Sequence, residues 1–188
     1  MKIAVILGTN REGRRSERVG KWVMAELEKL GGAEFELLDL KDYPMPFYEE
    51  PTSPDALDRP FKSEAANRWK EKIAEADGFF IITAEYNHAP AAVLKNALDY
   101  VYSEWSKKPV AFISYAPGAG AGIRAVEILR LVVCELEMVP CQAALHIAKV
   151  VDSIDEDGNL LDGGYDKRLE MVLTQLLWWT KALKNARD

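Results

Sequence analysis

The chain has 188 residues, 48% of them hydrophobic and 29% charged, and its 24 basic and 30 acidic residues give a formal net charge of −6. This composition is ordinary for a globular protein and fits one domain over residues 1–188. The acidic balance argues against non-specific nucleic-acid binding. Because no run approaches the roughly 18–20 apolar residues of a membrane span, we expect a cytoplasmic protein with no membrane partner.

The chain has few residues of the types that could bind a metal ion or form a disulfide. Cys134 and Cys141 are the only cysteines and lie in or beside apolar segments, which predicts two buried free thiols. His88 and His146 are far apart in the sequence, and we expect no metal site.

The first half of the chain begins with strand and helix patterns in alternation. The apolar run at 2–8 predicts a strand, and a helix follows from Ser16 until Gly31 and Gly32 stop it. Polar and apolar residues alternate over 34–40, which predicts a second strand that is less buried and lies at an edge of the sheet. Residues 41–62 hold five of the nine prolines and are predicted to be an extended connection that covers a site or a partner subunit, or simply crosses the surface.

The second half continues the alternation. Helices are predicted over 63–76, through 93–101, through 126–133 and over 169–183, and strands over 78–83 and 109–115. A short fifth strand lies somewhere in 138–148, where Pro140 obscures the boundary. Right-handed crossovers would wind these elements into a three-layer α/β sandwich around a parallel sheet of order 2-1-3-4-5. The carboxyl ends of the first, third and fourth strands would then be neighbours, and the loops that follow them, 8–18, 84–90 and 115–122, would meet there.

The first of these loops, "GTNREGRRSER", has the groups that bind a terminal phosphate. It lacks the glycine spacing of a dinucleotide fingerprint and the Gly-Lys-Ser/Thr triplet of a P-loop. It has short polar side chains, a helix start and four cations, namely Thr9, Asn10, Ser16, Arg11, Arg14, Arg15 and Arg18. The alternative is that Ser16 is an ordinary N-cap and that the arginines belong to a solvated loop.

The other two loops could border a flat ligand. Tyr86 in "AEYNHAPA" can stack on a ring and Asn87 can donate and accept, although a polar turn with a left-handed Asn87 is an alternative. The small residues of "APGAGAG" can bring amides against a heterocycle, or can serve helix–sheet packing alone. The three loops would thus offer, in order, a site for a phosphate, an aromatic side chain and a backbone of small residues. Flavin mononucleotide (FMN) has its phosphate, ribityl chain and ring system in the same order.

Several motifs together resemble one family, the flavodoxin-like NAD(P)H-dependent FMN reductases, which include quinone, azo and chromate reductases. These motifs are "GTNREGRR" followed by "VGKWV", "EYNH" followed by "LKNALDYVYSEW", and "KPVAFISY" followed by "RAVEILR". The resemblance implies a flavodoxin-like fold that binds FMN noncovalently. It departs from the family at Ala84, where proline is usual, and at Pro117, where glycine is common.

The resemblance also implies roles for individual residues. Thr9, Arg11, Arg15 and Ser16 match the phosphate positions, Glu85, Tyr86 and Asn87 match the segment along the ring, and Tyr115, Gly118, Ala119 and Gly120 match the segment around the pyrimidine edge. Such proteins are usually homodimers or homotetramers. Trp105, Trp178 and Trp179 would suit a subunit interface, although buried core is the commoner fate of tryptophan.

The implied activity is hydride transfer from NADPH or NADH through FMN to a flavin, quinone or similar small acceptor. The cofactor carries this chemistry, so no side chain is required as a catalytic acid or base. The alternatives are a flavodoxin-type electron carrier and a flavin-binding module that senses redox state. Both would bind FMN without oxidising a nicotinamide nucleotide.

Overall fold

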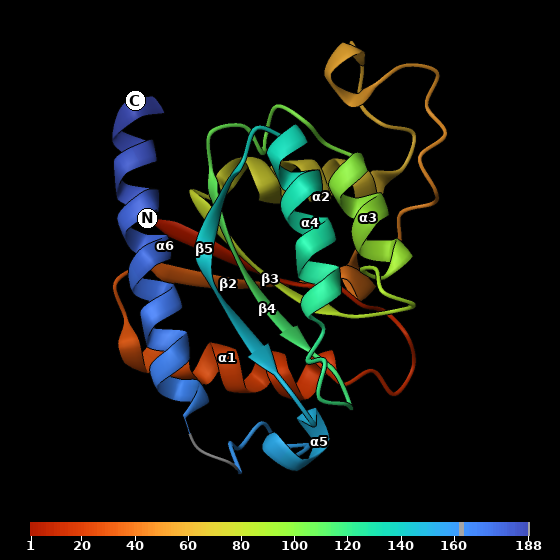
Figure 1. The fold of residues 1–188 in the computed structure, drawn as a ribbon. Helices are drawn as coiled ribbons and strands as arrows, with labels where there is room; N and C mark the ends of the chain where they lie inside the picture. The colour runs from red at the N-terminus through yellow and green to blue at the C-terminus, as the bar shows by residue number, and fades with distance from the viewer. Residues whose placement is uncertain (162–163, 188) are drawn as a thin grey trace.

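A five-stranded parallel sheet forms the centre of the computed structural model, which describes residues 1–161 and 164–187 (Figure 1). The strand order is β2-β1-β3-β4-β5, as predicted. The strands are β1 Lys2–Leu7, β2 Glu34–Asp39, β3 Gly78–Ala84, β4 Pro109–Tyr115 and β5 Val139–Ile147. Every residue of β3 and β4 is buried, whereas only one residue of β2 is buried, and the strand order confirms the predicted edge position of β2.

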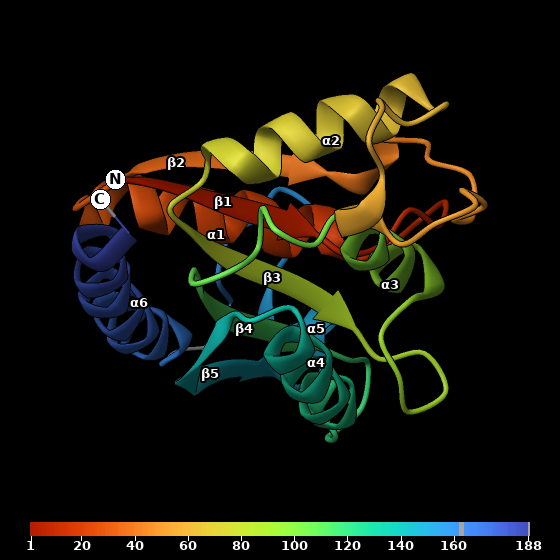
Figure 2. The same ribbon diagram turned by 90° about the horizontal axis from the view of Figure 1, so that it is seen from above.

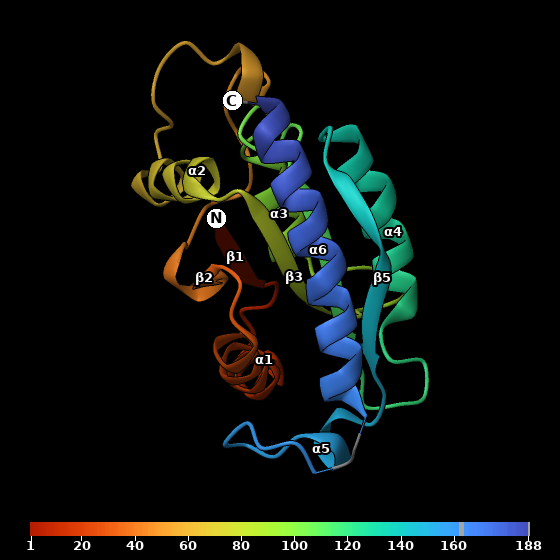
Figure 3. The ribbon, with the colours of Figure 1, turned by 90° about the vertical axis from the view of Figure 1, so that its left-hand side faces the viewer.

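Helices cover both faces of the sheet and complete the predicted three-layer sandwich (Figure 2). The helices are α1 Ser16–Leu30, α2 Glu64–Glu75, α3 Ala92–Asp99, α4 Ile123–Glu135, α5 Val150–Ser153 and α6 Tyr165–Arg187. One buried apolar cluster joins α2, α3 and α4 to one face, and a second joins α1 and α6 to the other. Figure 3 shows the short α5 beyond the lower end of α6.

Several expectations about elements need correction. The helix expected through Val101 ends at Asp99, because Tyr100 already lies at its C-cap. The fifth strand is nine residues long rather than short. The four-residue α5 has no counterpart in the predicted elements, since a single turn is too short to show a helical period.

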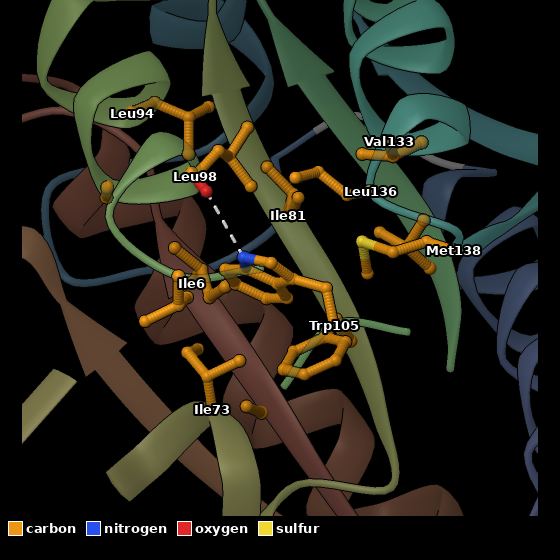
Figure 4. Close-up of a cluster of buried hydrophobic side chains, with 14 of the residues drawn as sticks. Ile6, Ile73, Ile81, Leu94, Leu98, Trp105, Val133, Leu136 and Met138 are labelled. Atoms are coloured by element: carbon orange, nitrogen blue, oxygen red, sulfur yellow. Dashed lines mark hydrogen bonds between the residues drawn. The ribbon is translucent and has the colours of Figure 1, made fainter. Parts of the chain in front are cut away.

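Trp105 belongs to the core and is unavailable to a subunit interface. It is completely buried, and its indole Nε1 donates to the Leu98 carbonyl oxygen over 3.2 Å (Figure 4). Ile6, Ile81 and Met138 lie around the same ring in Figure 4. Trp178 on α6, in contrast, is 64% exposed.

Cys134 is also exposed, contrary to expectation, because it lies on the outer side of α4, and only Cys141 is buried.

The proline-rich connection runs over the surface and is fastened to α3. The Asn96 side chain accepts from the Tyr48 amide over 3.1 Å and donates to the Pro46 carbonyl oxygen over 2.8 Å. Two short 3₁₀ turns, η1 Leu40–Asp42 and η2 Pro54–Ala56, interrupt the segment. None of its residues lines the pocket described below, so the structure does not support the alternative in which the segment covers that site.

Candidate functional site

A pocket of about 190 Å³ lies where the carboxyl ends of β1, β3 and β4 meet. All three predicted loops contribute to its lining, which consists of Arg11, Arg15, Ala84, Glu85, Tyr86, Tyr115 and Pro117. Larger hollows of about 580 and 670 Å³ lie beside α2 and along α6. We assign the site to the smaller pocket, because ligands of open α/β sheets bind at the carboxyl ends of the strands.

The four arginines of the first loop divide into two structural and two pocket-lining residues. Arg14 is only 5% exposed, and it donates to Asp39 Oδ1 over 2.6 Å and to Glu17 Oε1 over 3.0 Å. Arg18 donates to the Ile154 carbonyl oxygen over 3.0 Å. Arg11 and Arg15 remain at the pocket. Neither Arg14 nor Arg18 is therefore available for a phosphate there, a distinction that the sequence alone does not show.

The carboxylate of Asp39 explains why Arg14 is held so firmly. Burial by itself raises the pKa of Asp39, but hydrogen bonds from Arg14 and from the Lys41 amide outweigh it, and the pKa lies below its ordinary value. Asp39 closes β2, where a dinucleotide-binding fold would need an acid for a ribose. Here that carboxylate is already bound to arginine.

The first turn of α1 has no side-chain cap. Arg15, not Ser16, occupies the N-cap position, and its side chain makes no capping hydrogen bond. The interpretation of Ser16 as an ordinary N-cap is therefore wrong. Uncapped amides at a helix start, together with the dipole of the helix, favour an anion.

Thr9 and Ser16 lie beneath this turn. Thr9 Oγ1 donates to Ser16 Oγ over 2.8 Å, and both side chains are completely buried. The structure thus brings the predicted phosphate residues together, but places these two hydroxyls behind the pocket surface. Burial raises the pKa of the Tyr115 phenol, and the hydroxyls of Thr9 and Ser16 partly oppose that rise, so Tyr115 connects the third loop to the first.

The second loop is a tight hairpin turn. The amides and carbonyl oxygens of Tyr86 and Ala89 bond to each other over 2.8 and 3.0 Å, and the two residues between them, Asn87 and His88, have φ angles of 50° and 69°. This is the geometry of a type I′ turn, in which asparagine is favoured. Asn87 is exposed and does not line the pocket, whereas Tyr86 does.

Glu85 is engaged by Arg124, a residue absent from the predicted site. Its carboxylate accepts from the Arg124 amide over 3.1 Å and from Arg124 Nε over 2.6 Å, and Arg124 Nη2 also contacts it. Burial raises the pKa of Glu85, but these bonds to Arg124 outweigh burial and lower the pKa overall. The only sequence signal for Arg124 was an arginine in the first turn of the helix that follows the third loop.

The third loop is held by bonds at its ends and by the carbonyl oxygens of Gly118 and Gly120 in its middle. Ser114 Oγ donates to the Ala121 carbonyl oxygen over 2.7 Å, so His146 Nδ1, also at 2.7 Å, is the donor to that hydroxyl. Gly122 must be glycine, because its φ is 79° and a Cβ there would lie 3.0 Å from Ser114 Cβ. Within the described residues, the exposed amides of Gly118, Ala119 and Gly120 donate no hydrogen bond.

The residues present fit a ligand with an anionic tail and a flat ring. Arg11, Arg15 and the uncapped start of α1 supply positive charge and donors at the pocket, and the rings of Tyr86 and Tyr115 also line it. Across residues 1–161 and 164–187, no group of histidine, cysteine and acidic side chains is arranged to hold a metal ion. In the same ranges no helix combines the length and apolar character needed to cross a membrane.

Comparisons with known proteins agree with this geometry. Residues 1–152 match the family of NADPH-dependent FMN reductases. An NAD(P)H-dependent FMN reductase of Schizosaccharomyces pombe is 34% identical over 79% of this chain and 74% of its own length, and a 2-hydroxy-1,4-benzoquinone reductase of a Burkholderia species is 30% identical over 96% and 97%.

A solved structure agrees as well. The flavoenzyme FerB of Paracoccus denitrificans, an NAD(P)H:acceptor oxidoreductase, superposes with a TM-score of 0.78 at 26% identity, covering 96% of this chain and 97% of its own. The chain therefore belongs to the NADPH-dependent FMN reductase family and is an NAD(P)H-dependent oxidoreductase that uses FMN.

Proposed function

We propose that this enzyme oxidises NADPH or NADH and reduces quinones or similar planar acceptors at the pocket between the three loops. The observation that carries the proposal is the convergence on one pocket of Arg11 and Arg15, the exposed Tyr86, and the third loop. The 30% identity to a benzoquinone reductase over nearly the whole chain supports the acceptor class.

In this proposal the FMN phosphate binds at the start of α1. Arg11 and Arg15 supply charge, the uncapped amides supply donors, and the Thr9–Ser16 pair supports the turn from below. The ring lies along Glu85, Tyr86 and Asn87. The amides of Gly118, Ala119 and Gly120, together with Tyr115, border its pyrimidine edge.

When bound, FMN supplies the hydride-transfer chemistry. The residues of this chain then bind and orient the reactants, and no side chain serves as a catalytic acid or base. Backbone donors aimed at the ring stabilise negative charge that develops there. The carboxylate of Glu85 cannot act as a base without giving up its bonds to Arg124.

The proposal extends to a homodimer or homotetramer in the cytoplasm. Met171 and Trp178, 49% and 64% exposed, lie on one side of α6 and offer apolar area for a subunit contact. Both cysteines are free thiols, which suits a reducing compartment. Sedimentation of the purified protein tests the assembly.

Anaerobic reduction tests the activity itself. The protein loaded with FMN should lose its flavin absorption band within seconds of NADPH addition, and benzoquinone added afterwards should restore it. Free FMN at the same concentration is the control. A band that persists with both NADPH and NADH but is lost with dithionite would instead indicate an electron carrier or a redox sensor.

A further inference from the structure

The pair formed by Glu85 and Arg124 joins two loops that border the pocket. Glu85 follows β3 and lines the pocket, and Arg124 lies in the first turn of α4, directly after the third loop. Among the described residues, every hydrogen bond between loop 84–90 and residues 116–124 comes from this pair. Ala84 and Tyr115 are paired in the sheet just before the two loops, so this pair fixes how the loops lie beyond the strand ends.

Glu85 also caps α4 from outside the helix. The N-cap residue, Gly122, makes no side-chain capping bond, and Glu85 Oε2 accepts from the Arg124 amide in its place. Such a cap stabilises the first turn of the helix by satisfying one of its free amides. The turn is continuous with Gly118, Ala119 and Gly120, whose amides are free to bind a ligand.

The pair also controls the charge of the pocket. The Glu85 side chain is only 7% exposed, whereas that of Arg124 is 54% exposed, so the carboxylate faces inward and the guanidinium faces solvent. Without its partner, this carboxylate would repel an anionic ligand and disfavour added negative charge on a ring beside it. Arg124 offsets that charge.

We propose that Arg124 is a positioning residue, which through Glu85 sets the spacing of the two ring-side loops and neutralises the pocket, and thereby tunes FMN affinity and reduction potential. This inference rests on the proposed FMN site. Arg124 itself touches neither the ring nor the phosphate in this account.

A double-mutant cycle tests the inference. FMN affinity is measured by fluorescence titration of the apoprotein, and the midpoint potential by equilibration with a reference dye. Arg124→Met should raise the FMN Kd about tenfold and lower the midpoint potential, because it leaves the Glu85 carboxylate uncompensated beside an anionic ligand. Glu85→Gln in the Arg124→Met background should recover most of the potential, because no unpaired carboxylate remains. Arg124→Lys should retain most of the affinity.

Lys29→Met is the matched control. It also removes a cation paired with a carboxylate, Glu26 at 2.7 Å, but at the far end of α1. The inference fails if the FMN Kd of Arg124→Met stays within twofold of the wild-type value, or if Lys29→Met raises the Kd equally. It also fails if the changes in midpoint potential caused by the Glu85 and Arg124 substitutions simply add. If Arg124→Met does not fold, the FMN affinity and the midpoint potential of Arg124→Lys and Glu85→Gln test the inference instead. If wild-type apoprotein binds no FMN, the proposed function itself fails.

Discussion

Arg11 and Arg14 lie three positions apart in the first loop, but substitution of Arg11 should affect FMN binding and substitution of Arg14 should affect stability. Arg11 is exposed at the pocket, so Arg11→Ala should weaken FMN binding by at least ~1.5 kcal/mol, with little change in the urea midpoint of the apoprotein. Arg14→Met should leave FMN binding less affected but lower the free energy of unfolding by about 2–3 kcal/mol, because it leaves Asp39 half-enclosed without its partner.

The stability lost in Arg14→Met should depend on pH. The pKa of Asp39 is lowered in the folded protein, so its contribution is fully present above the ordinary value of 3.8 and is lost as pH falls through the lower, folded value. In Arg14→Met burial acts without its partner and raises the pKa of Asp39, so the difference between the two proteins should be constant near neutral pH and shrink as acid protonates Asp39, first in the variant and then in wild type. Urea unfolding at pH 3 and pH 6 measures it, and a difference equal at both values would contradict the assignment.

The two arginines also show what sequence reasoning can and cannot reach. Four arginines after a strand correctly indicate a cationic loop at the edge of the sheet, because that depends only on the order of elements. Which of them faces a ligand depends on Asp39, 25 residues after Arg14, and on Ile154, 136 residues after Arg18. Partners at such distances become neighbours only after the sheet has formed.

The strand β5 illustrates the same limit for a whole element. Between Val110 and Phe112 the pairing of β4 with β5 shifts register, so Cys141–Ala143 bulge away from the ladder. Side chains of α4 and α6 bind the freed backbone groups: Arg130 donates to the carbonyl oxygens of Cys141 and Gln142, and Gln175 accepts from the Ala143 amide over 2.7 Å. Pro140 is tolerated because β5 is an edge strand beside a bulge.

Gln175→Leu should loosen this bulge. The Ala143 amide would lose its acceptor, so its hydrogen exchange should accelerate, and the free energy of unfolding should fall by about 1–2 kcal/mol. Exchange measured residue by residue by NMR checks the first effect, and urea unfolding the second. Thr174→Leu, at the exposed neighbouring position of α6, is the control. Unchanged exchange at Ala143 would show that Gln175 is dispensable.

Across the molecule, the two ends of the sheet have separate chemistry. The pocket lies at the carboxyl ends of the strands, while the amino ends carry a network of ion pairs, including Lys2 with Glu36 over 2.7 Å and Lys184 with Asp77 over 2.8 Å. Substitutions at the amino ends should therefore alter stability while leaving FMN binding unchanged. Alternation of strands and helices predicts this division from sequence, but the individual ion pairs again depend on distant partners.

Lys108 is the most enclosed charge at the amino ends. It is 8% exposed, and its ammonium donates to the carbonyl oxygens of Ile73 and Ala74 at the end of α2 over 2.8 and 3.1 Å. Burial, reinforced by Arg187, lowers the pKa of Lys108 from 10.5 to about 8. Between these values the unfolded chain binds a proton that the folded protein does not, so Lys108 adds stability as pH rises through this window.

Comparison with Lys108→Met isolates this effect from other titrating groups. Below pH 8 the stability difference between the two proteins should be constant, and from pH 8 to 10.5 it should shift by about 3 kcal/mol in favour of wild type, at about 1.36 kcal/mol per pKa unit. Neutral lysine keeps two donors for its two carbonyl oxygens, so the hydrogen bonds survive deprotonation. Urea unfolding at several pH values measures the difference. A flat difference across this range would mean that the α2 carbonyl oxygens compensate fully for the burial of the ammonium.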